Sequence, residues 1–278
     1  MLLTIITINR NNASGLEKTI QSVLAQKRDD FEYIVVDGAS MDGSVDVIRR
    51  LAPGFGNRLK WLSEPDKGIY HAINKGIKMA AGEYVEILNS GDSLASNDVV
   101  ERMCVALEKE GHPSILYGNM QKVFPDGHVH KDRGFSGEDM TLLSFFIGTL
   151  NHSPAYIQRS LFEKYGLYDE SLKIVSDWKW YLQAVVFGGE RPVYTDVDVT
   201  LFDMTGISET NKDLCGSERE QVLREMVHPA ILADYVEWTP AIRQMRRIKN
   251  HPWAYKMVWF LERCLFKIEK WKDKRVNG

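Results

Sequence analysis

The stretch Glu83-Tyr-Val-Glu-Ile-Leu-Asn-Ser-Gly-Asp92 joins an apolar run to a polar turn. Its first residues suit a buried strand, and Gly82 before them ends a helical pattern. From Asn89 onward, oxygen-bearing side chains replace the apolar ones. Ligands of open α/β sheets bind beyond the carboxyl ends of strands, so this segment is a candidate site. Asp92, helped by Asn89, can hold a hard divalent cation. The alternative is an ordinary turn, since these residue types are common in turns.

The residues before this stretch alternate between strand and helix patterns. Apolar strand patterns at 2–8, 33–36, 59–62 and 83–88 are separated by helical periodicity, and Ser14 and Glu17 have capping-box spacing at the first helix. This order predicts right-handed crossovers and a mainly parallel sheet. From about residue 114, a strand at 114–117 and a hairpin with arms 120–124 and 128–131 add antiparallel structure. The fold class is therefore mixed α/β.

Composition narrows the class of protein. The chain has 278 residues, 44% hydrophobic and 26% charged, which fits a soluble protein with one large domain or one domain and an appendage. Its three cysteines are far apart, which argues against a disulfide framework and suits a reducing compartment. The first eight residues lack a basic leader, and no run of 18 apolar residues occurs. We therefore expect a first strand there, not a signal peptide, and a cytoplasmic location.

A dinucleotide site is the obvious rival for this pattern, but its motifs are missing. The first strand is followed by Asn9-Arg-Asn-Asn12, with no glycine fingerprint, and the chain has no GxxxxGK[ST] loop. A phosphate ligand must then be held through a metal or basic side chains.

Charge divides the chain into two parts. Residues 240–278 contain eleven Lys and Arg against three Asp and Glu, whereas the rest has an excess of acidic residues. Trp, Phe and aliphatic residues interleave with the basic ones, a pattern typical of interfacial anchors. This predicts association with the inner face of the cell membrane; the alternative is a helix packed on the body with a solvated basic face. No other feature supports nucleic-acid binding.

Five segments, in order, resemble the sequence blocks of the family 2 glycosyltransferases. They are Thr4-Ile-Ile-Thr-Ile-Asn-Arg10, Ile34-Val-Val-Asp-Gly-Ala-Ser-Met-Asp-Gly-Ser44, Ser63-Glu-Pro-Asp-Lys-Gly-Ile-Tyr70, residues 83–92, and His152-Ser-Pro followed by Gly166 to Trp178. The resemblance covers roughly residues 1–205. It implies a GT-A fold, a nucleotide-sugar donor (UDP is the commonest), a divalent metal (Mn or Mg) and inversion at the anomeric carbon. The sequence most resembles bacterial enzymes that build capsule, exopolysaccharide or O-antigen on saccharide or lipid-linked acceptors.

The resemblance also implies domains and site residues. It makes residues 1–113 the nucleotide-sugar half and 114–205 the acceptor half. The residues beyond it, 206–278, are expected from their own pattern to form a loop and a helical tail, with a helix at about 217–235. Residues 206–216 are polar, and we expect them to close over the donor. In the nucleotide site, Thr7 and Asn9 approach the base, Asp37 accepts from base or ribose, and Asp66 and Lys67 line the pocket.

On the acceptor side, Asp177 matches the family's catalytic carboxylate, the base that takes the acceptor proton. The alternative for Asp177 is a helix N-cap. His152 is expected to help bind the acceptor or to be structural. Trp178 and Trp180 either stack on sugars or pack in the core.

Two glycines depart from the family pattern. Gly38 replaces the second carboxylate of the Asp-Asp-Gly-Ser block, and Asn89-Ser-Gly-Asp92 keeps one carboxylate where Asp-x-Asp-Asp is common. One aspartate is enough for a magnesium ion that also binds phosphates and water, so a weakly held metal is expected. The departures leave a second function open, a catalytically impaired subunit that binds nucleotide sugar or polysaccharide.

Overall fold

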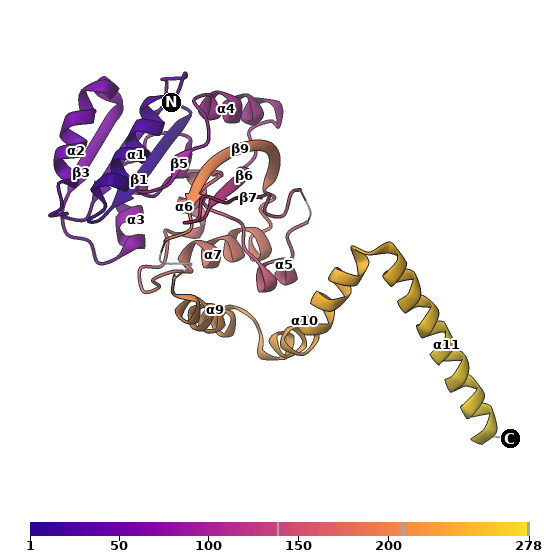
Figure 1. Cartoon of the computed structure of the whole chain (residues 1–278). Helices are drawn as coiled ribbons and strands as arrows, with labels where there is room; N and C mark the ends of the chain where they lie inside the picture. Colours follow the sequence, from indigo (N-terminus) through magenta and orange to yellow (C-terminus); the bar gives the residue numbers. More distant parts are fainter. Residues whose placement is uncertain (138, 207–209, 277–278) are drawn as a thin grey trace. The chain divides into compact units, whose positions relative to one another are not determined.

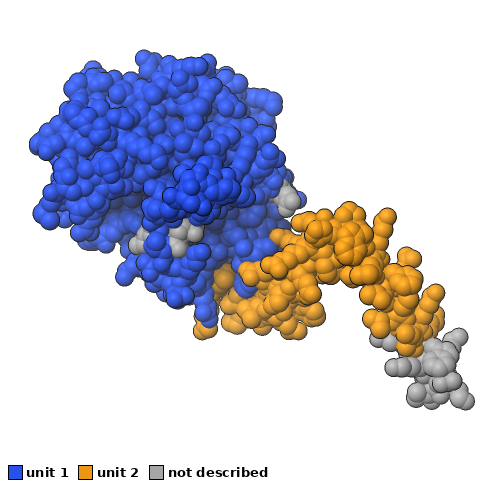
Figure 2. Space-filling view, viewed as in Figure 1, with its two compact units in different colours: residues 1–222 blue, residues 223–278 orange. Residues whose placement is uncertain are grey.

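Figure 1 shows the computed structural model, which describes residues 1–137, 139–206 and 210–276. The chain forms two compact units, Met1–Val222 and Leu223–Gly278, which are coloured separately in Figure 2. The first unit holds the whole sheet, and the second is helical. Each unit is described by itself below.

The N-terminal strands form the parallel part of the sheet, as predicted. The strands β1 (Leu3–Asn9), β2 (Glu32–Asp37), β3 (Leu59–Ser63) and β4 (Tyr84–Ile87) lie in the order β3-β2-β1-β4. All residues of β1, β2 and β4 are buried, as expected for a parallel sheet covered on both faces. The helices α1 (Ala13–Leu24), α2 (Ser44–Leu51) and α4 (Val99–Lys109) share one core with this sheet. Helix α3 (Ile69–Met79) packs against Ile6 of β1 through Gly76.

The sheet continues with five further strands, of which the sequence predicted only β6 and β7. They are β5 (Ser93–Leu94), β6 (Ile115–Val123), β7 (Val129–Asp132), β8 (Ala155–Gln158) and β9 (Val193–Asp203), in the order β4-β8-β6-β9-β5. Strand β8 is antiparallel to β4, whereas β9 runs parallel to β6. The hairpin β6–β7 is confirmed. Its first arm and the expected strand at 114–117 are one strand, so that prediction was wrong in its boundaries.

The first unit extends beyond the boundary that we expected at residue 205. Short helices α5 (Leu142–Ile147), α6 (Ser160–Tyr165) and α7 (Ser176–Tyr181), which continues into η2 (Leu182–Phe187), cover the acceptor half, and α9 (Lys212–Met226) follows β9. The buried Glu218 carboxylate of α9 accepts hydrogen bonds from the backbone N–H groups of residues 173–175. These bonds tie α9 to the acceptor half, which explains why the unit ends at Val222.

Two helices replace the single one expected at 217–235. Helix α9 ends at Met226, and α10 (Pro229–Lys249) begins with a proline. Proline lacks a backbone N–H and favours the first turn of a helix, so it starts α10 instead of extending α9. Helix α11 (Pro252–Val276) completes the second unit. Within the expected loop at 206–216, residues 207–209 lie outside the described residues, and closure over the donor stays a prediction.

The start of α1 links this helix to the polar turn after β4. The Asn12 side chain caps α1 by accepting from the Gly15 backbone N–H at 3.1 Å, so the expected capping box at Ser14 was wrong. The same side chain donates to the Ser90 carbonyl at 3.2 Å. Asn12 therefore holds the 89–92 turn against the helix.

A carboxyl group in the core gives a test of this packing. Glu86 of β4 is fully buried, and neither of its oxygens has a hydrogen-bond partner among the described residues. Burial raises its pKa from 4.5 to about 8. Folding therefore takes up a proton between these two pH values, so the free energy of unfolding falls as pH rises from about 4.5 to about 8.

We expect Glu86→Gln to remove this pH dependence. At neutral pH the variant should be more stable by roughly 1–3 kcal/mol, because no proton has to be taken up on folding. Urea unfolding at pH 5 and pH 8 measures the change, with Glu83→Gln, an exposed carboxylate beside the same strand, as control. An equal pH slope in wild type and Glu86→Gln would contradict the assignment.

Candidate active site

A network of polar side chains joins the carboxyl ends of β1, β2 and β3. In the strand register Asn9 lies opposite Asp37, and Asp37 lies opposite Ser63. Asn9 Nδ2 donates to Asp37 Oδ1 at 2.8 Å, and Ser63 Oγ donates to Asp37 Oδ2 at 2.6 Å. Ser40 donates to both oxygens. Burial alone would raise the Asp37 pKa, but these hydrogen bonds hold it below its usual value. Asp37 thus fixes three strand ends, and its role toward a base stays a prediction.

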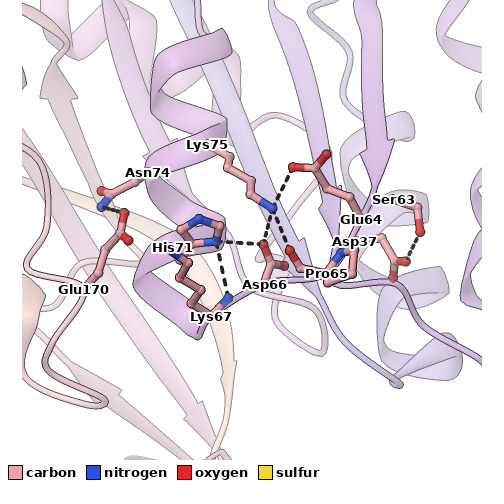
Figure 3. A network of polar contacts seen from close by, with 10 residues as sticks. All are labelled: Asp37, Ser63, Glu64, Pro65, Asp66, Lys67, His71, Asn74, Lys75 and Glu170. Atoms are coloured by element: carbon pink, nitrogen blue, oxygen red, sulfur yellow. Dashed lines mark hydrogen bonds and ion pairs between the residues drawn. The ribbon is translucent and has the colours of Figure 1, made fainter.

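The loop after β3 holds a second carboxylate, which has contacts of its own beside this network (Figure 3). Asp66 accepts from Lys75 Nζ at 2.6 Å and lies 3.3 Å from His71 Nδ1. A Cβ built on Gly38 would lie 3.0 Å from Asp66 Oδ2. The Asp66 carboxylate therefore occupies the space beside Gly38, where the family pattern has its second carboxylate. The Lys67 side chain is exposed, and its role toward a diphosphate stays a prediction.

Thr7 does not belong to this polar network. Its side chain is fully buried, and its hydroxyl accepts a hydrogen bond from Tyr33 Oη at 3.0 Å inside the sheet core. Strand β1 continues for two more residues before it reaches the sheet edge, and the approach of Thr7 to a nucleotide base stays a prediction.

A cavity of about 440 Å³ is lined by the turn after β4 and by elements of the acceptor half. Five of the predicted site residues line it: Asn89, Asp92, His152, Asp177 and Trp178. The nucleotide-site residues at the ends of β1 to β3 do not line it. Asn9 and Asp37 thus belong to the strand-end network, whereas these five residues line the cavity.

Asp177 is held between a histidine and a tyrosine. Its Oδ2 lies 3.0 Å from His152 Nδ1, and its Oδ1 lies 3.0 Å from Tyr70 Oη. Tyr70 Oη also lies 2.5 Å from the Ile174 carbonyl oxygen, so the single hydroxyl proton serves two acceptors. The N-cap of α7 is Val175, with no side-chain cap, so the alternative that Asp177 is an N-cap is wrong.

The Asp177–His152 contact sets the charge of both groups. Burial would raise the Asp177 pKa, but the hydrogen bond and charge of His152 lower it below its usual value. Burial would lower the His152 pKa, but the same contact raises it. On its other side, His152 Nε2 lies 3.3 Å from Asn89 Nδ2. A chain of contacts therefore runs from the 89–92 turn through His152 to a carboxylate that is ionised at neutral pH.

Asp92 and Asp203 place two carboxylates at the 89–92 turn. Burial raises the Asp92 pKa to about 7, and the Asp203 charge adds to the rise. Asp92 Oδ1 accepts from the Asp203 backbone N–H at 2.9 Å. A Cβ built on Gly91 would lie 3.7 Å from Asp203 Oδ2, so Asp203 approaches the position at which the family pattern has a carboxylate. Gly91 has φ +105°, a conformation that favours glycine.

This turn fits a divalent cation that shares its ligands with a substrate. The described residues contain no group of three His, Cys, Asp or Glu side chains that would hold a metal alone. Two carboxylates are present, however, and the buried Asn89 Oδ1 has no hydrogen-bond partner among the described residues. Oxygen donors are what Mg²⁺ and Mn²⁺ take, and Mg²⁺ usually keeps water and phosphate oxygens as further ligands.

Sequence reasoning missed several residues of the cavity. Arg219 of α9 lies 5.0 Å over the Trp178 ring, and its buried Nε has no partner in the described part of the chain. Tyr70, Asp203 and Lys122 also line the cavity, and Lys122 is paired with Asp132 at 2.7 Å. The resemblance included Tyr70 in a matching segment without a role. No local pattern marked the other three, which reach the cavity from distant elements.

The two tryptophans differ in position. Trp178 lines the cavity, although it is buried and its Nε1 donates to the Phe145 carbonyl at 3.0 Å. Trp180 is also buried, but its ring packs 4.8 Å from that of Phe162 and does not line the cavity. The alternative of core packing is therefore correct for Trp180, and its predicted stacking on a sugar is not.

Comparison with known proteins identifies the class. The profile of Glycosyl transferase family 2 matches residues 4–166. An uncharacterized glycosyltransferase of Mycobacterium tuberculosis is 34% identical over 222 residues, which are 78% of each chain. A PGL/p-HBAD biosynthesis glycosyltransferase of Mycobacterium bovis is 27% identical over 182 residues, 66% of this chain and 69% of the relative. The chain belongs to glycosyl transferase family 2 and is a glycosyltransferase.

Solved structures confirm the fold class. S. aureus TarS 1–349 in complex with UDP superposes with a TM-score of 0.63 at 19% identity, covering 86% of this chain and 71% of that one. The chain spans 43% of the longer TarS structure. A mannosyltransferase from Pyrobaculum calidifontis, solved with GDP-Man and Mn²⁺, gives a TM-score of 0.56 at 21% identity over 72% of this chain and 56% of that one. The fold is that of GT-A glycosyltransferases.

Proposed function

We propose that the protein is an inverting glycosyltransferase that moves a sugar from a UDP-sugar to a hydroxyl group of a saccharide or lipid-linked saccharide. The observation that carries this proposal is the shared cavity, which is lined by the 89–92 turn, by Asp203 at the end of β9 and by the Asp177–His152 pair. Two named proteins support the choice of ligands, since TarS was crystallised with UDP and UDP-GlcNAc and the M. bovis relative is named for PGL/p-HBAD biosynthesis. Bacterial surface polysaccharide synthesis is the proposed setting.

In this mechanism Asp177 is the general base. The acceptor hydroxyl oxygen attacks the anomeric carbon from the face opposite the diphosphate, its bond to that carbon forms, and the bond from the carbon to the diphosphate oxygen breaks. The acceptor proton passes to an Asp177 oxygen. His152 and Tyr70 keep the carboxylate ionised and aimed, through their 3.0 Å contacts. His152 also links the base to the 89–92 turn through Asn89.

The 89–92 turn would bind the leaving group's counter-ion. Asp92, Asp203 and Asn89 would hold a divalent cation, which supplies positive charge to the departing diphosphate when bound. Arg219 lines the same cavity, its Nε has no partner among the residues that the structure describes, and it adds a second positive group. Its stacking on Trp178 holds the guanidinium plane, an arrangement suited to a phosphate.

The alternative, an impaired binding subunit, rested on Gly38 and Gly91. The structure brings the Asp66 carboxylate beside the first and the Asp203 carboxylate beside the second. The negative charges that the family pattern has at these two positions are therefore supplied by other parts of the chain, which favours an active enzyme.

Nucleotide binding gives the first test. We expect UDP with Mn²⁺ to raise the melting temperature by roughly 2–5 °C at saturating concentration, since a ligand that binds only the folded state stabilises it by mass action. Arg219→Gln should remove much of this gain, because the diphosphate loses a charged partner. Arg102→Gln, an exposed arginine of α4, is the matched control. No stabilisation by UDP, GDP or dTDP, each with Mn²⁺, would contradict the proposal.

A further inference from the structure

The second unit presents large apolar side chains to solvent. On α11, these side chains recur every three or four residues and so share one face of the helix. We call this face the apolar stripe. Its members are Trp253, Met257, Phe260, Leu261, Leu265 and Ile268, which are 49–71% exposed. Soluble proteins rarely expose a continuous apolar surface of this kind unless it binds something.

A row of basic residues runs beside the apolar stripe. Lys256, Arg263, Lys267 and Lys270 are all exposed and also recur at helical spacing, and we call them the basic stripe. The last turn of α10 adds Arg246, Arg247 and Lys249. Trp259 and Phe266 are exposed on the other side of the basic stripe. Long basic side chains beside apolar ones can reach the headgroup region while the apolar groups enter the acyl boundary.

We propose that α11 lies flat on the surface of an anionic lipid bilayer, with the apolar stripe inserted and the basic stripe against the headgroups. The helix of 25 residues is about 37 Å long, at 1.5 Å per residue. Lying flat, it brings the whole apolar stripe into contact with one bilayer surface. No helix in the described part of the chain is long and apolar enough to cross a membrane.

The charge of residues 240–278 distinguishes a lipid surface from other possible partners of α11. Residues 240–278 carry eleven basic and three acidic residues. Two such tails side by side would repel each other, whereas an anionic surface attracts each of them. A nucleic acid would satisfy the basic stripe but would leave the aliphatic members of the apolar stripe in water. Only an interface with both anionic and apolar layers matches both stripes.

The test is vesicle sedimentation of the full chain. Wild type should bind vesicles of phosphatidylcholine with phosphatidylglycerol, bind pure phosphatidylcholine vesicles at least tenfold more weakly, and dissociate as salt rises. Phe260→Ser with Leu265→Ser should weaken binding by about tenfold or more, since two apolar side chains that would insert into the bilayer are lost. Lys256→Gln with Arg263→Gln and Lys267→Gln should weaken binding to the anionic vesicles only. Val105→Ser, which removes an exposed apolar side chain of α4, should change nothing.

Each other outcome overturns the proposal. These are absence of binding to anionic vesicles, equal binding by wild type and Phe260→Ser/Leu265→Ser, or loss of binding in Val105→Ser. Self-association without lipid that is abolished by the apolar-stripe variant would assign the surface to a second copy of the chain. Quenching of tryptophan fluorescence by brominated lipid gives a readout on wild type alone, so the proposal stays testable if a variant fails to fold; no quenching overturns it.

Discussion

Asp177→Asn is expected to reduce sugar transfer by roughly 10²–10⁴-fold, the usual contribution of a general base. The amide keeps the shape of the side chain but cannot take the acceptor proton. Donor affinity should survive, because the carboxylate contacts His152 and Tyr70 and is proposed to meet the acceptor. Transfer rate and nucleotide affinity, measured on the same preparation, separate these effects.

Two controls sharpen the Asp177 experiment. Asp169→Asn removes a carboxylate from the same part of the chain, one that pairs with Lys179 at 2.7 Å and does not line the cavity, so transfer should be nearly normal. Because the Asp177 pKa lies below its usual 3.8, wild-type transfer should not lose this base until the pH falls below that value. Near-normal transfer by Asp177→Asn would remove Asp177 from the mechanism.

Asp92→Asn is expected to abolish the extra stabilisation that Mn²⁺ gives to the UDP complex. Transfer should fall by roughly two orders of magnitude or more, since a cation at a departing phosphate contributes several kcal/mol. The fold should survive, because an amide oxygen can still accept from the Asp203 backbone N–H and no buried charge remains. Thermal unfolding with UDP, with and without Mn²⁺, measures the effect.

Asp203→Asn tests whether the second carboxylate acts with Asp92. Its Oδ1 accepts from the Thr205 backbone N–H and hydroxyl, contacts that asparagine can keep. A partial loss of the Mn²⁺ effect is expected, while Asp126→Asn in the β6–β7 turn should have none. Unchanged Mn²⁺-dependent stabilisation in both Asp92→Asn and Asp203→Asn would reject the metal site.

Hydrophobic periodicity was sufficient to predict most of the sheet. The parallel strands are buried apolar runs between amphipathic helices, so their positions follow from the pattern. The expected strands at 114–117 and 120–124 are one strand, β6, with Gly118 and Asn119 between them. In the structure Asn119 is buried and donates to Asp196 and Asp198, so a polar residue is satisfied inside the sheet. A sequence does not show such cross-strand partners.

The candidate site was predictable only where its residues share a local segment. The polar turn after β4 and Asp177 belong to such segments. Asp203 and Arg219 reach the cavity from the end of β9 and from α9, so their proximity depends on the sheet order and on the docking of α9 by Glu218. Trp180 was predicted at the acceptor side but packs in the core, because tryptophan suits both sugar stacking and core packing.

The most direct measurement is the release of UDP from UDP-sugars in the presence of Mn²⁺ and an acceptor extract. The anomeric configuration of the product is then determined. Wild type should release UDP and give a product inverted relative to the donor. Asp177→Asn should still bind the nucleotide, and Asp92→Asn should still fold, but both should release little UDP. A retained configuration, or equal release by wild type and Asp177→Asn, would contradict inverting transfer with Asp177 as the base.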